Sequence, residues 1–237
     1  GWPVIGVDMD MNGIGEPVEA WRKPAVKKET KILLPATSDT FEGKELGLQW
    51  QFNHNPVDEA WSLTERKGMI TFHALKADNF KVARNTLTQK TMGYTGTATV
   101  KMIWSSKDMT DGQRCGLACM GKQNWTLGVM QEAGKRYVYL EKDNEVIQKV
   151  PAKGSVIYLR MEADATNNAY QLLYSYNAKD FVALGDKFPM QFVNWKGVRI
   201  GLYCYNINKE AGRVSFDDFV YVHDGPIKEF IHKAIKK

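Results

Sequence analysis

The chain has 237 residues, of which 43% are hydrophobic, and it carries seven Trp, ten Tyr and ten Phe. This composition supports a packed core and excludes an intrinsically disordered protein. The formal net charge is +5, but basic residues are spread along the chain among acidic ones, so no nucleic-acid partner is expected. No apolar run is long enough to cross a bilayer, so no membrane partner is expected either.

Residues 1–35 contain a loop rich in Asp, Asn and Gly, followed by a linker-like segment. The loop has the spacing of a calcium-binding loop, with oxygen ligands at Asp8, Asp10 and Asn12 and a carboxylate at Glu19. The flanking residues predict a strand rather than a helix, so a helix-loop-helix hand is not expected. Two interpretations remain open: a strand-flanked loop that binds a structural Ca²⁺, and a plain surface turn.

Residues 36–225 consist of short β-forming runs separated by turn signals such as Ala133-Gly134 and Asp143-Asn144. This pattern is typical of an all-β sandwich or barrel. Residues 78–96 are too long for a hairpin loop and are predicted to form a long loop that could carry function. The predicted strands are residues 46–53, 61–65, 69–75, 96–105, 114–120, 124–131, 135–141, 145–150, 155–163, 168–176, 181–184, 198–206 and 212–223.

The segment 41–68 holds the densest group of aromatic and amide side chains in the sequence. Alternation places Trp50 and Phe52 on one face of a strand and amide side chains on the other. Aromatic rings beside amides suit a sugar surface, with Trp50 or Trp61 stacking on a pyranose ring. The same pattern is also typical of an ordinary half-buried strand. The candidate sugar-binding residues in and near this segment are Trp50, Asn53, His54, Asn55 and Arg84.

A second calcium site is predicted between Asp39, before the first sandwich strand, and Asp217 in the last one. In jelly-roll sandwiches the first and last strands are neighbours, so these carboxylates could converge on a structural Ca²⁺. Strand alternation puts Phe216 and Asp218 on one face, and Asp217 and Phe219 on the other. The alternative is that these acids cap turns and face water.

The three cysteines, Cys115, Cys119 and Cys204, are an odd number and make a poor disulfide framework. Cys115 and Cys119 lie on one predicted strand about 13 Å apart, too far to bridge. We therefore predict three buried free thiols.

Hydrolases that cut sugars commonly use two acids from one face of a strand. The nearest candidate pair is Glu162 and Asp164, which lies where a strand runs into a turn and has no aromatic cleft beside it. The sequence therefore predicts no catalytic residues in this chain.

Residues 226–237 change to a helical period, with the apolar residues on one face. They predict a short amphipathic helix that docks on its own domain or frays. Contact with a membrane is the less favoured alternative.

A series of segments follow one another in order: LGLQWQFNHNPVDEAWSLTERKG, ARNTLTQ, CGLACMG, SVIYLRMEAD, YQLLYSYNAKDFVALG and GLYC…SFDDFVY. This series resembles the C-terminal domain of glycoside hydrolase family 43, the β-xylosidase and α-L-arabinofuranosidase group. The segment GWPVIGVDMDMNGIGEPV resembles the end of the five-bladed propeller that precedes this domain. The resemblance implies a concanavalin A-like antiparallel β-sandwich over residues 36–225, with a propeller remnant and linker in residues 1–35.

In that family the catalytic acids lie on the propeller, which this chain lacks. The resemblance therefore implies an accessory domain that braces the propeller and closes its substrate pocket around xylan or arabinoxylan fragments. The loop that would reach the pocket corresponds to residues 107–114, with Met109 and Gln113 best placed for contact. Two alternatives remain open: an independent carbohydrate-binding module and a purely structural domain.

Overall fold

The structure of the protein is a computed structural model that describes residues 6–20, 33–191 and 195–225. The residues before Leu34 form one compact unit, and those from Leu34 onward form another. In the first unit, Val7 and Glu16 form an isolated β-bridge that closes the acidic loop. The helix predicted for residues 226–237 lies outside the described residues.

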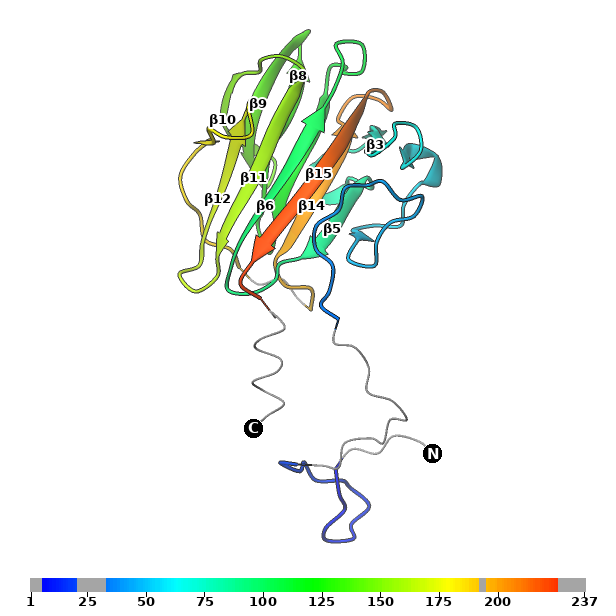
Figure 1. The fold of residues 1–237 in the computed structure, drawn as a ribbon, viewed down its shortest axis with the longest axis vertical. Coiled ribbons are helices and arrows are strands. Elements are labelled where there is room, and N and C mark those ends of the chain that lie inside the picture. The colour runs from blue at the N-terminus through cyan, green and yellow to red at the C-terminus, as the bar shows by residue number, and fades with distance from the viewer. Residues whose placement is uncertain (1–5, 21–32, 192–194, 226–237) are drawn as a thin grey trace. The chain divides into compact units, whose positions relative to one another are not determined.

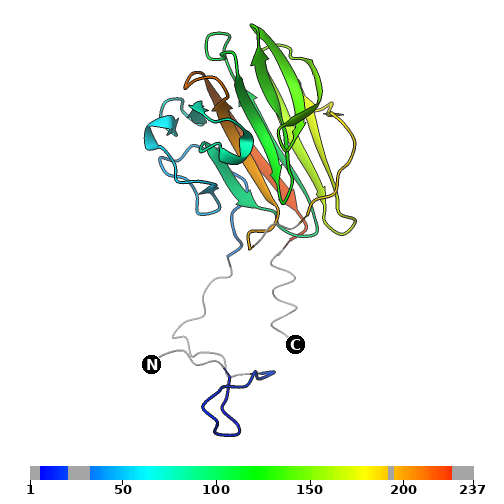
Figure 2. The ribbon, with the colours of Figure 1, turned by 180° about the vertical axis from the view of Figure 1, so that it is seen from behind.

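The second unit is a sandwich of two β-sheets that face each other, as the opposite views in Figures 1 and 2 show. All strand pairs are antiparallel except β4 with β14. One sheet has the order β1-β5-β14-β7-β8-β9-β10, and the other has the order β13-β12-β11-β6-β15-β3-β2. The structure therefore confirms the all-β sandwich.

The first sheet comprises β1 (Gln51–Phe52), β4 (Leu75–Lys76), β5 (Thr86–Lys90), β7 (Gln113–Met120), β8 (Asn124–Glu132), β9 (Lys135–Lys142), β10 (Glu145–Pro151) and β14 (Arg199–Asn206). The second comprises β2 (Trp61–Ser62), β3 (Ile70–His73), β6 (Thr95–Ile103), β11 (Val156–Asp164), β12 (Ala169–Ser175), β13 (Val182–Ala183) and β15 (Arg213–His223). The 3-10 turns are η1 (Asp58–Ala60) and η2 (Phe80–Val82). No helix in the described part of the chain has the length and apolar character to span a membrane.

The hairpins between β8, β9 and β10 form where the turn signals predicted them. Asp143 and Asn144 both have positive φ, at 45° and 79°, and Ala133 and Gly134 have φ of 46° and 73°. Two successive positive φ values are the geometry of the tight hairpin turn whose twist matches that of the flanking strands. Asn and Gly adopt this geometry readily, which explains why these dipeptides mark the strand ends.

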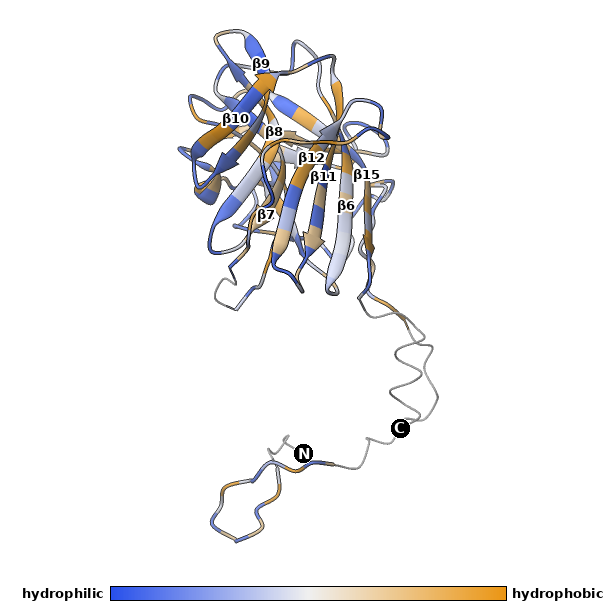
Figure 3. Cartoon of the chain, turned by 90° about the vertical axis from the view of Figure 1, so that its left-hand side faces the viewer, coloured by the Kyte–Doolittle hydropathy of each residue, from blue (hydrophilic) through white to orange (hydrophobic). Residues whose placement is uncertain are grey.

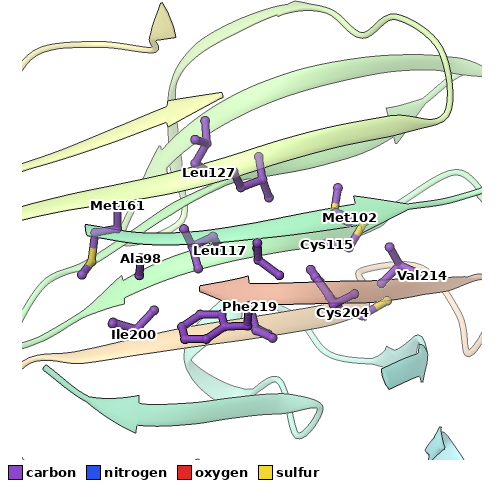
Figure 4. Close-up of a cluster of buried hydrophobic side chains, with 14 of the residues drawn as sticks. Ala98, Met102, Cys115, Leu117, Leu127, Met161, Ile200, Cys204, Val214 and Phe219 are labelled. Atoms are coloured by element: carbon purple, nitrogen blue, oxygen red, sulfur yellow. The ribbon is translucent and has the colours of Figure 1, made fainter. Parts of the chain in front are cut away.

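The main core lies between the two sheets and is made by side chains that face inward from the strands. Figure 3 shows hydrophobic and hydrophilic residues following one another along these strands. In β11, for example, Ile157, Leu159 and Met161 are fully buried. Figure 4 shows Met161 and Met102 from one sheet in the same cluster as Leu117 from the other. Each fully buried side chain of this size stabilises the fold by about 1.5–3 kcal/mol relative to an exposed one.

The three cysteines belong to this buried region and are free thiols, as predicted. Burial raises the pKa of the Cys204 thiol to about 12 and raises those of Cys115 and Cys119 as well. Because the thiolate is the reactive form, these side chains are inert packing groups at neutral pH.

A second cluster covers the outer face of the eight-stranded sheet. Phe80 of η2 lies edge-on against Tyr203, with ring centroids 5.1 Å apart. The hydroxyls of Tyr203 and Tyr139 are 2.7 Å apart and share a hydrogen bond. The segment around η2 therefore closes over the sheet and removes its aromatic side chains from water.

The structure corrects two strand predictions. The segment predicted as a strand over 46–53 forms one only at β1, and the predicted long loop 78–96 contains β5. The sequence of β5 is TLTQK, which reads as polar, yet Thr86, Thr88 and Gln89 are buried. Their side chains donate to the backbone oxygens of neighbouring segments, so their polarity is satisfied inside the fold.

Strands β7 and β8 approach each other closely at Gly116 and Gly128, which are paired in register. A Cβ added to Gly128 would lie 1.9 Å from the carbonyl oxygen of Cys115. Because that oxygen belongs to the backbone, the strands would have to separate. We expect Gly128→Ala to lower the free energy of unfolding by about 3 kcal/mol in urea denaturation.

Gly201→Ala in the neighbouring strand β14 is the matched control. Its added Cβ would meet only side-chain atoms, the nearest being the Met120 sulfur at 3.0 Å. This side chain can move, so we expect a loss of about 1 kcal/mol. Equal losses in the two variants would contradict the close approach of the backbones.

Candidate functional site

Trp50 lies in the core rather than on the surface. Its side chain is only 8% exposed and packs against Phe41 and Phe219, with ring centroids 5.8 Å and 4.9 Å away. The indole Nε1–H donates to Asp39 Oδ2 over 2.8 Å. Trp61 is half-buried and packs against Phe52 at 5.3 Å. The structure thus corrects the prediction that Trp50 stacks on a sugar, because almost none of its surface is free.

The Asp39 carboxylate accepts hydrogen bonds from several groups where the chain enters the sandwich. Besides Trp50, it accepts from the Phe41 backbone N–H at 2.8 Å and from Gln49 Nε2 at 3.3 Å. The backbone of Asp39 pairs with Phe219 of β15 in both directions. The predicted neighbourhood of the first and last segments of the sandwich is therefore confirmed.

Asp39 and Asp217, which were predicted to share a calcium ion, each have partners of their own within the protein. Asp217 pairs with Lys101, whose Nζ lies 3.1 Å from Oδ2, while Asp39 has the partners above. A hydrogen-bond donor or a cation satisfies each carboxylate separately, so neither needs a shared metal ion. Among the described residues, neither acid belongs to a cluster that could hold a metal.

The alternation predicted for SFDDF is also interrupted. Phe216 and Phe219 are both fully buried, although they are three residues apart. The register with β6 shifts between Asp217 and Val220, and Asp218 has a positive φ of 46°. This β-bulge adds one residue to the strand and returns Phe219 to the core face.

His54, Asn55 and Arg84 remain at an exposed polar edge beside β1. Arg84 donates through Nε and Nη2 to the Asn55 carbonyl, at 3.0 and 2.8 Å. His54 Nε2 lies 2.9 Å from the Lys81 carbonyl. These bonds tie the loop after β1 to the segment around η2. The side chains hold the loop and are also accessible to a ligand.

Asn53 contacts a buried arginine, Arg199, that the sequence did not point to. Its Oδ1 accepts from Arg199 Nη1 at 2.8 Å, and Thr88 Oγ1 lies 3.3 Å from the same nitrogen. Arg199 is only 8% exposed, and its Nε is buried without a hydrogen-bond partner. Burial lowers the pKa of Arg199, but a guanidinium stays charged at neutral pH. The only signal in the sequence is an Arg within the otherwise apolar run VRIGLYC.

Arg199 lines a groove of about 900 Å³. Its walls are residues 34–37, 47–51, 88–90 and 92. Among the described residues, the lining contains Lys90 and several amide side chains and includes no Asp or Glu. The groove combines apolar surface with positive charge, which favours an anionic ligand over a cationic one.

Met109 and Gln113, predicted to contact substrate, are both buried. Met109 is part of the main core. Gln113 Nε2 donates to the Arg213 carbonyl at 3.2 Å, and its Oε1 accepts from Thr110 N at 3.2 Å. The structure corrects this prediction too: both residues anchor the loop between β6 and β7 rather than face a ligand.

An ion-pair network fixes the same loop from outside. Arg213 Nε lies 2.8 Å from Asp108 Oδ1, and Nη1 lies 2.7 Å from Glu65 Oε1. His73 Nε2 lies 2.7 Å from Glu65 Oε2. Burial alone would raise the pKa of both carboxyls. At Glu65 the hydrogen bonds and charges of His73 and Arg213 outweigh burial, so its pKa is lowered. At Asp108 hydrogen bonds from Ser105 and Arg213, together with the charge of Arg213, lower the pKa in the same way. The loop is therefore held in one arrangement at neutral pH.

The acidic loop of the first unit brings together a different set of residues from the predicted one. Ligand oxygens of Asp8, Asp10 and Glu16 lie within 4.8 Å of one another, and Glu19 is not in the group. Asn12 Nδ2 donates to Asp10 Oδ2 at 2.9 Å, and the Asn12 backbone N–H donates to Asp8 at 3.0 Å. The oxygen donors suit Ca²⁺, so a calcium ion at this loop stays a prediction, with Glu16 in place of Glu19.

Glu162 and Asp164 line an open groove of about 540 Å³ that also includes Asp224. Asp164 accepts from Asn167, and Asp224 accepts from Thr95, so both carboxylates cap turns. The side-chain bond from Asn167 lowers the pKa of Asp164, and the backbone bond from Thr95 lowers that of Asp224. A glycosidase acid needs a raised pKa, so these groups are unsuited to that role.

The chain matches a family model described as the β-xylosidase C-terminal concanavalin A-like domain over residues 38–222. A β-xylosidase from Formosa agariphila is 35% identical over 250 residues, covering 95% of this chain and 41% of that protein. A non-reducing-end α-L-arabinofuranosidase from Bacteroides ovatus is 25% identical over 182 residues, covering 73% of this chain and 32% of that protein.

Among solved structures, a bifunctional GH43-CE protein from Bacteroides eggerthii matches with a TM-score of 0.73 at 30% identity. The match covers 81% of this chain and 26% of that one. The chain spans about two fifths of the length of the curated relatives that are 35% and 38% identical to it.

The bond between Trp50 and Asp39 can be tested by a double-mutant cycle with Trp50→Phe and Asp39→Asn. Trp50→Phe removes the hydrogen bond and Asp39→Asn removes its negative charge, and we expect each to lower the free energy of unfolding by about 2 kcal/mol. The double variant is expected to lose about 1 kcal/mol less than the sum. Additive losses, or a melting temperature that rises with Ca²⁺ only when Asp39 is intact, would contradict this account.

Calcium binding can be tested by isothermal titration of the chain with CaCl₂. We expect one ion to bind, and binding to be lost in Asp8→Ala/Asp10→Ala because the oxygen donors are removed. Glu19→Gln is the matched control and should bind like the parent chain, because Glu19 lies outside the cluster. Unchanged binding in the double variant would exclude this loop as the site.

Proposed function

The chain belongs to the family of β-xylosidase C-terminal concanavalin A-like domains, and we propose that it is the accessory domain of a family 43 glycosidase. In this proposal the parent enzyme hydrolyses xylan or arabinoxylan oligosaccharides with a five-bladed propeller that precedes the sandwich. The sandwich braces the propeller and completes one wall of its substrate pocket. The observation that carries the proposal is the family match over residues 38–222.

The length and names of the relatives support this role. The chain corresponds to about two fifths of proteins that carry a β-xylosidase description, which leaves room for a catalytic domain in each of them. The carboxylates considered above also have structural partners. Asp164 and Asp224 cap turns, and Asp217 is paired with Lys101. We therefore propose that the chain is not catalytic by itself.

The loop between β6 and β7 remains the best candidate for the pocket wall, with revised roles for its residues. Met109 and Gln113 hold it from inside, and Arg213 holds it from outside through Asp108. The exposed Lys107 then stands on a loop with a fixed shape. A wall residue needs this support, because an unsupported loop positions ligand contacts poorly.

The alternative of an independent carbohydrate-binding module loses its aromatic platform, since Trp50 is buried and Trp61 half-buried. One observation still favours sugar binding by this chain, namely the groove lined by Arg199 and amide side chains. That groove suits a charged sugar better than a neutral one. Neutral xylan is therefore not the ligand we expect for the isolated chain.

The accessory role predicts that the purified chain does not hydrolyse 4-nitrophenyl β-xyloside or 4-nitrophenyl α-L-arabinofuranoside above the buffer rate. It also predicts no retardation in gels containing neutral arabinoxylan. A circular dichroism spectrum of a folded β-protein is the control for both assays. Turnover that survives repurification would contradict the proposal, and retardation by the neutral polymer would favour the binding-module alternative.

A further inference from the structure

Arg199 is a buried cation without a carboxylate partner. None of the ion pairs within the described residues includes it. Of its donors, Nη1 reaches the neutral acceptors Asn53 and Thr88, while Nε has no partner. Moving a charge out of water costs free energy unless an opposite charge compensates it. Within the described residues, the guanidinium is thus the charged group in this groove that has no opposite charge to compensate it.

The neighbours of Arg199 hold it ready for an incoming group. Asn53 and Thr88 fix one nitrogen, and Thr88 in turn donates to the Gln51 carbonyl at 2.9 Å. This support restricts the guanidinium to one orientation at the groove. A planar guanidinium held in this way matches the two oxygens of a carboxylate.

The rest of the lining resembles a surface for sugar hydroxyls and ring faces. Gln51 brings an exposed amide group, while Gln49 and Gln89 bring amides whose Nε2 atoms donate to Asp39 and to the Thr37 carbonyl. The fully exposed Leu48 and the side chain of Met92 bring apolar surface. Lys90, exposed on the strand next to Arg199, adds a second positive charge. The volume of about 900 Å³ lies in the range of sites that enclose an organic ligand.

We propose that this groove binds a sugar that carries a carboxylate, of the class of uronic-acid-substituted xylo-oligosaccharides, with Arg199 receiving the carboxylate. The amide side chains contact the hydroxyls of the neighbouring xylose units, and Lys90 adds long-range attraction. That the ligand carries a carboxylate is inferred from the residues lining the groove alone. The identity of the xylose backbone rests on the proposed function.

An acidic side chain of another protein is the competing occupant. The lining favours a sugar, because an acidic side chain of a protein would leave the exposed amide of Gln51 and the apolar surface beside Arg199 without new partners. Three glutamines gather on the walls of one groove, whereas a carboxylate from a protein needs only Arg199. The experiment therefore also measures the binding of succinate and of a glutamate-rich peptide.

The test is isothermal titration of the chain with xylotriose bearing one glucuronic acid, and with unsubstituted xylotriose. We expect the acidic sugar to bind at least about tenfold more tightly, since hydrogen bonds to a charged group contribute most in a site of low exposure. Arg199→Gln should reduce the acidic sugar to the affinity of the neutral one. Removing the buried cation is not expected to unfold the chain, which circular dichroism checks.

Lys90→Gln keeps the test decisive if Arg199→Gln fails to fold, because Lys90 is exposed. We expect this variant to bind the acidic sugar about threefold more weakly, with a smaller salt dependence. The control is Lys135→Gln, which should change nothing. Lys135 is exposed at the hairpin between β8 and β9, at the opposite end of the same sheet.

Equal affinity for the two sugars, or no binding of either, would overturn the proposal. It would also be overturned if succinate or a glutamate-rich peptide bound as tightly as the acidic sugar, since the site would then recognise a carboxylate without the sugar. These outcomes are separate from the turnover assay on nitrophenyl glycosides. A chain that lacks turnover but ignores the acidic sugar keeps its accessory role and loses only this site.

Discussion

The carboxylate of Asp39 determines how the chain enters the sandwich. It receives the indole N–H of Trp50 and a backbone N–H from Phe41, while the backbone of Asp39 pairs with Phe219 of the last strand. Trp50 then packs on Phe219, which faces the core only because of the bulge at Asp218. Each element needs the others: without the bulge Phe219 would face outward, and without Asp39 the buried indole N–H would lack its acceptor.

This arrangement decides what the aromatic segment can do. Because Trp50 is committed to the core, the residues on either side of it are left at the surface, where Leu48 and Gln51 become walls of the groove beside Arg199. In the groove proposed to bind a sugar, the segment therefore offers amide groups beside a guanidinium rather than a stacking ring. Its polar edge is a frame for Arg199 through Asn53.

The sequence predicted most of the strands because they alternate regularly and end at turn dipeptides whose φ values are positive, as at Asp143-Asn144. It could not predict β5, since Thr88 and Gln89 of that strand are buried through hydrogen bonds to segments distant in sequence. The bulge at Asp218 was hidden for a similar reason: strict alternation is the default, and only the partner strand shows where it fails. In the acidic loop, the β-bridge between Val7 and Glu16 closes the turn before Glu19. Glu16 therefore lies in the acidic cluster, where the spacing of the sequence had predicted Glu19.

The two regions proposed for function lie at opposite ends of the sandwich. Arg199 pairs with Met120 at the end where the chain enters near Leu34, whereas the loop held by Arg213 follows β6 at the other end. Strand β6 has nine residues, which corresponds to about 30 Å of separation. The groove and the loop can then serve different parts of one polysaccharide, and the loss of either leaves the other intact.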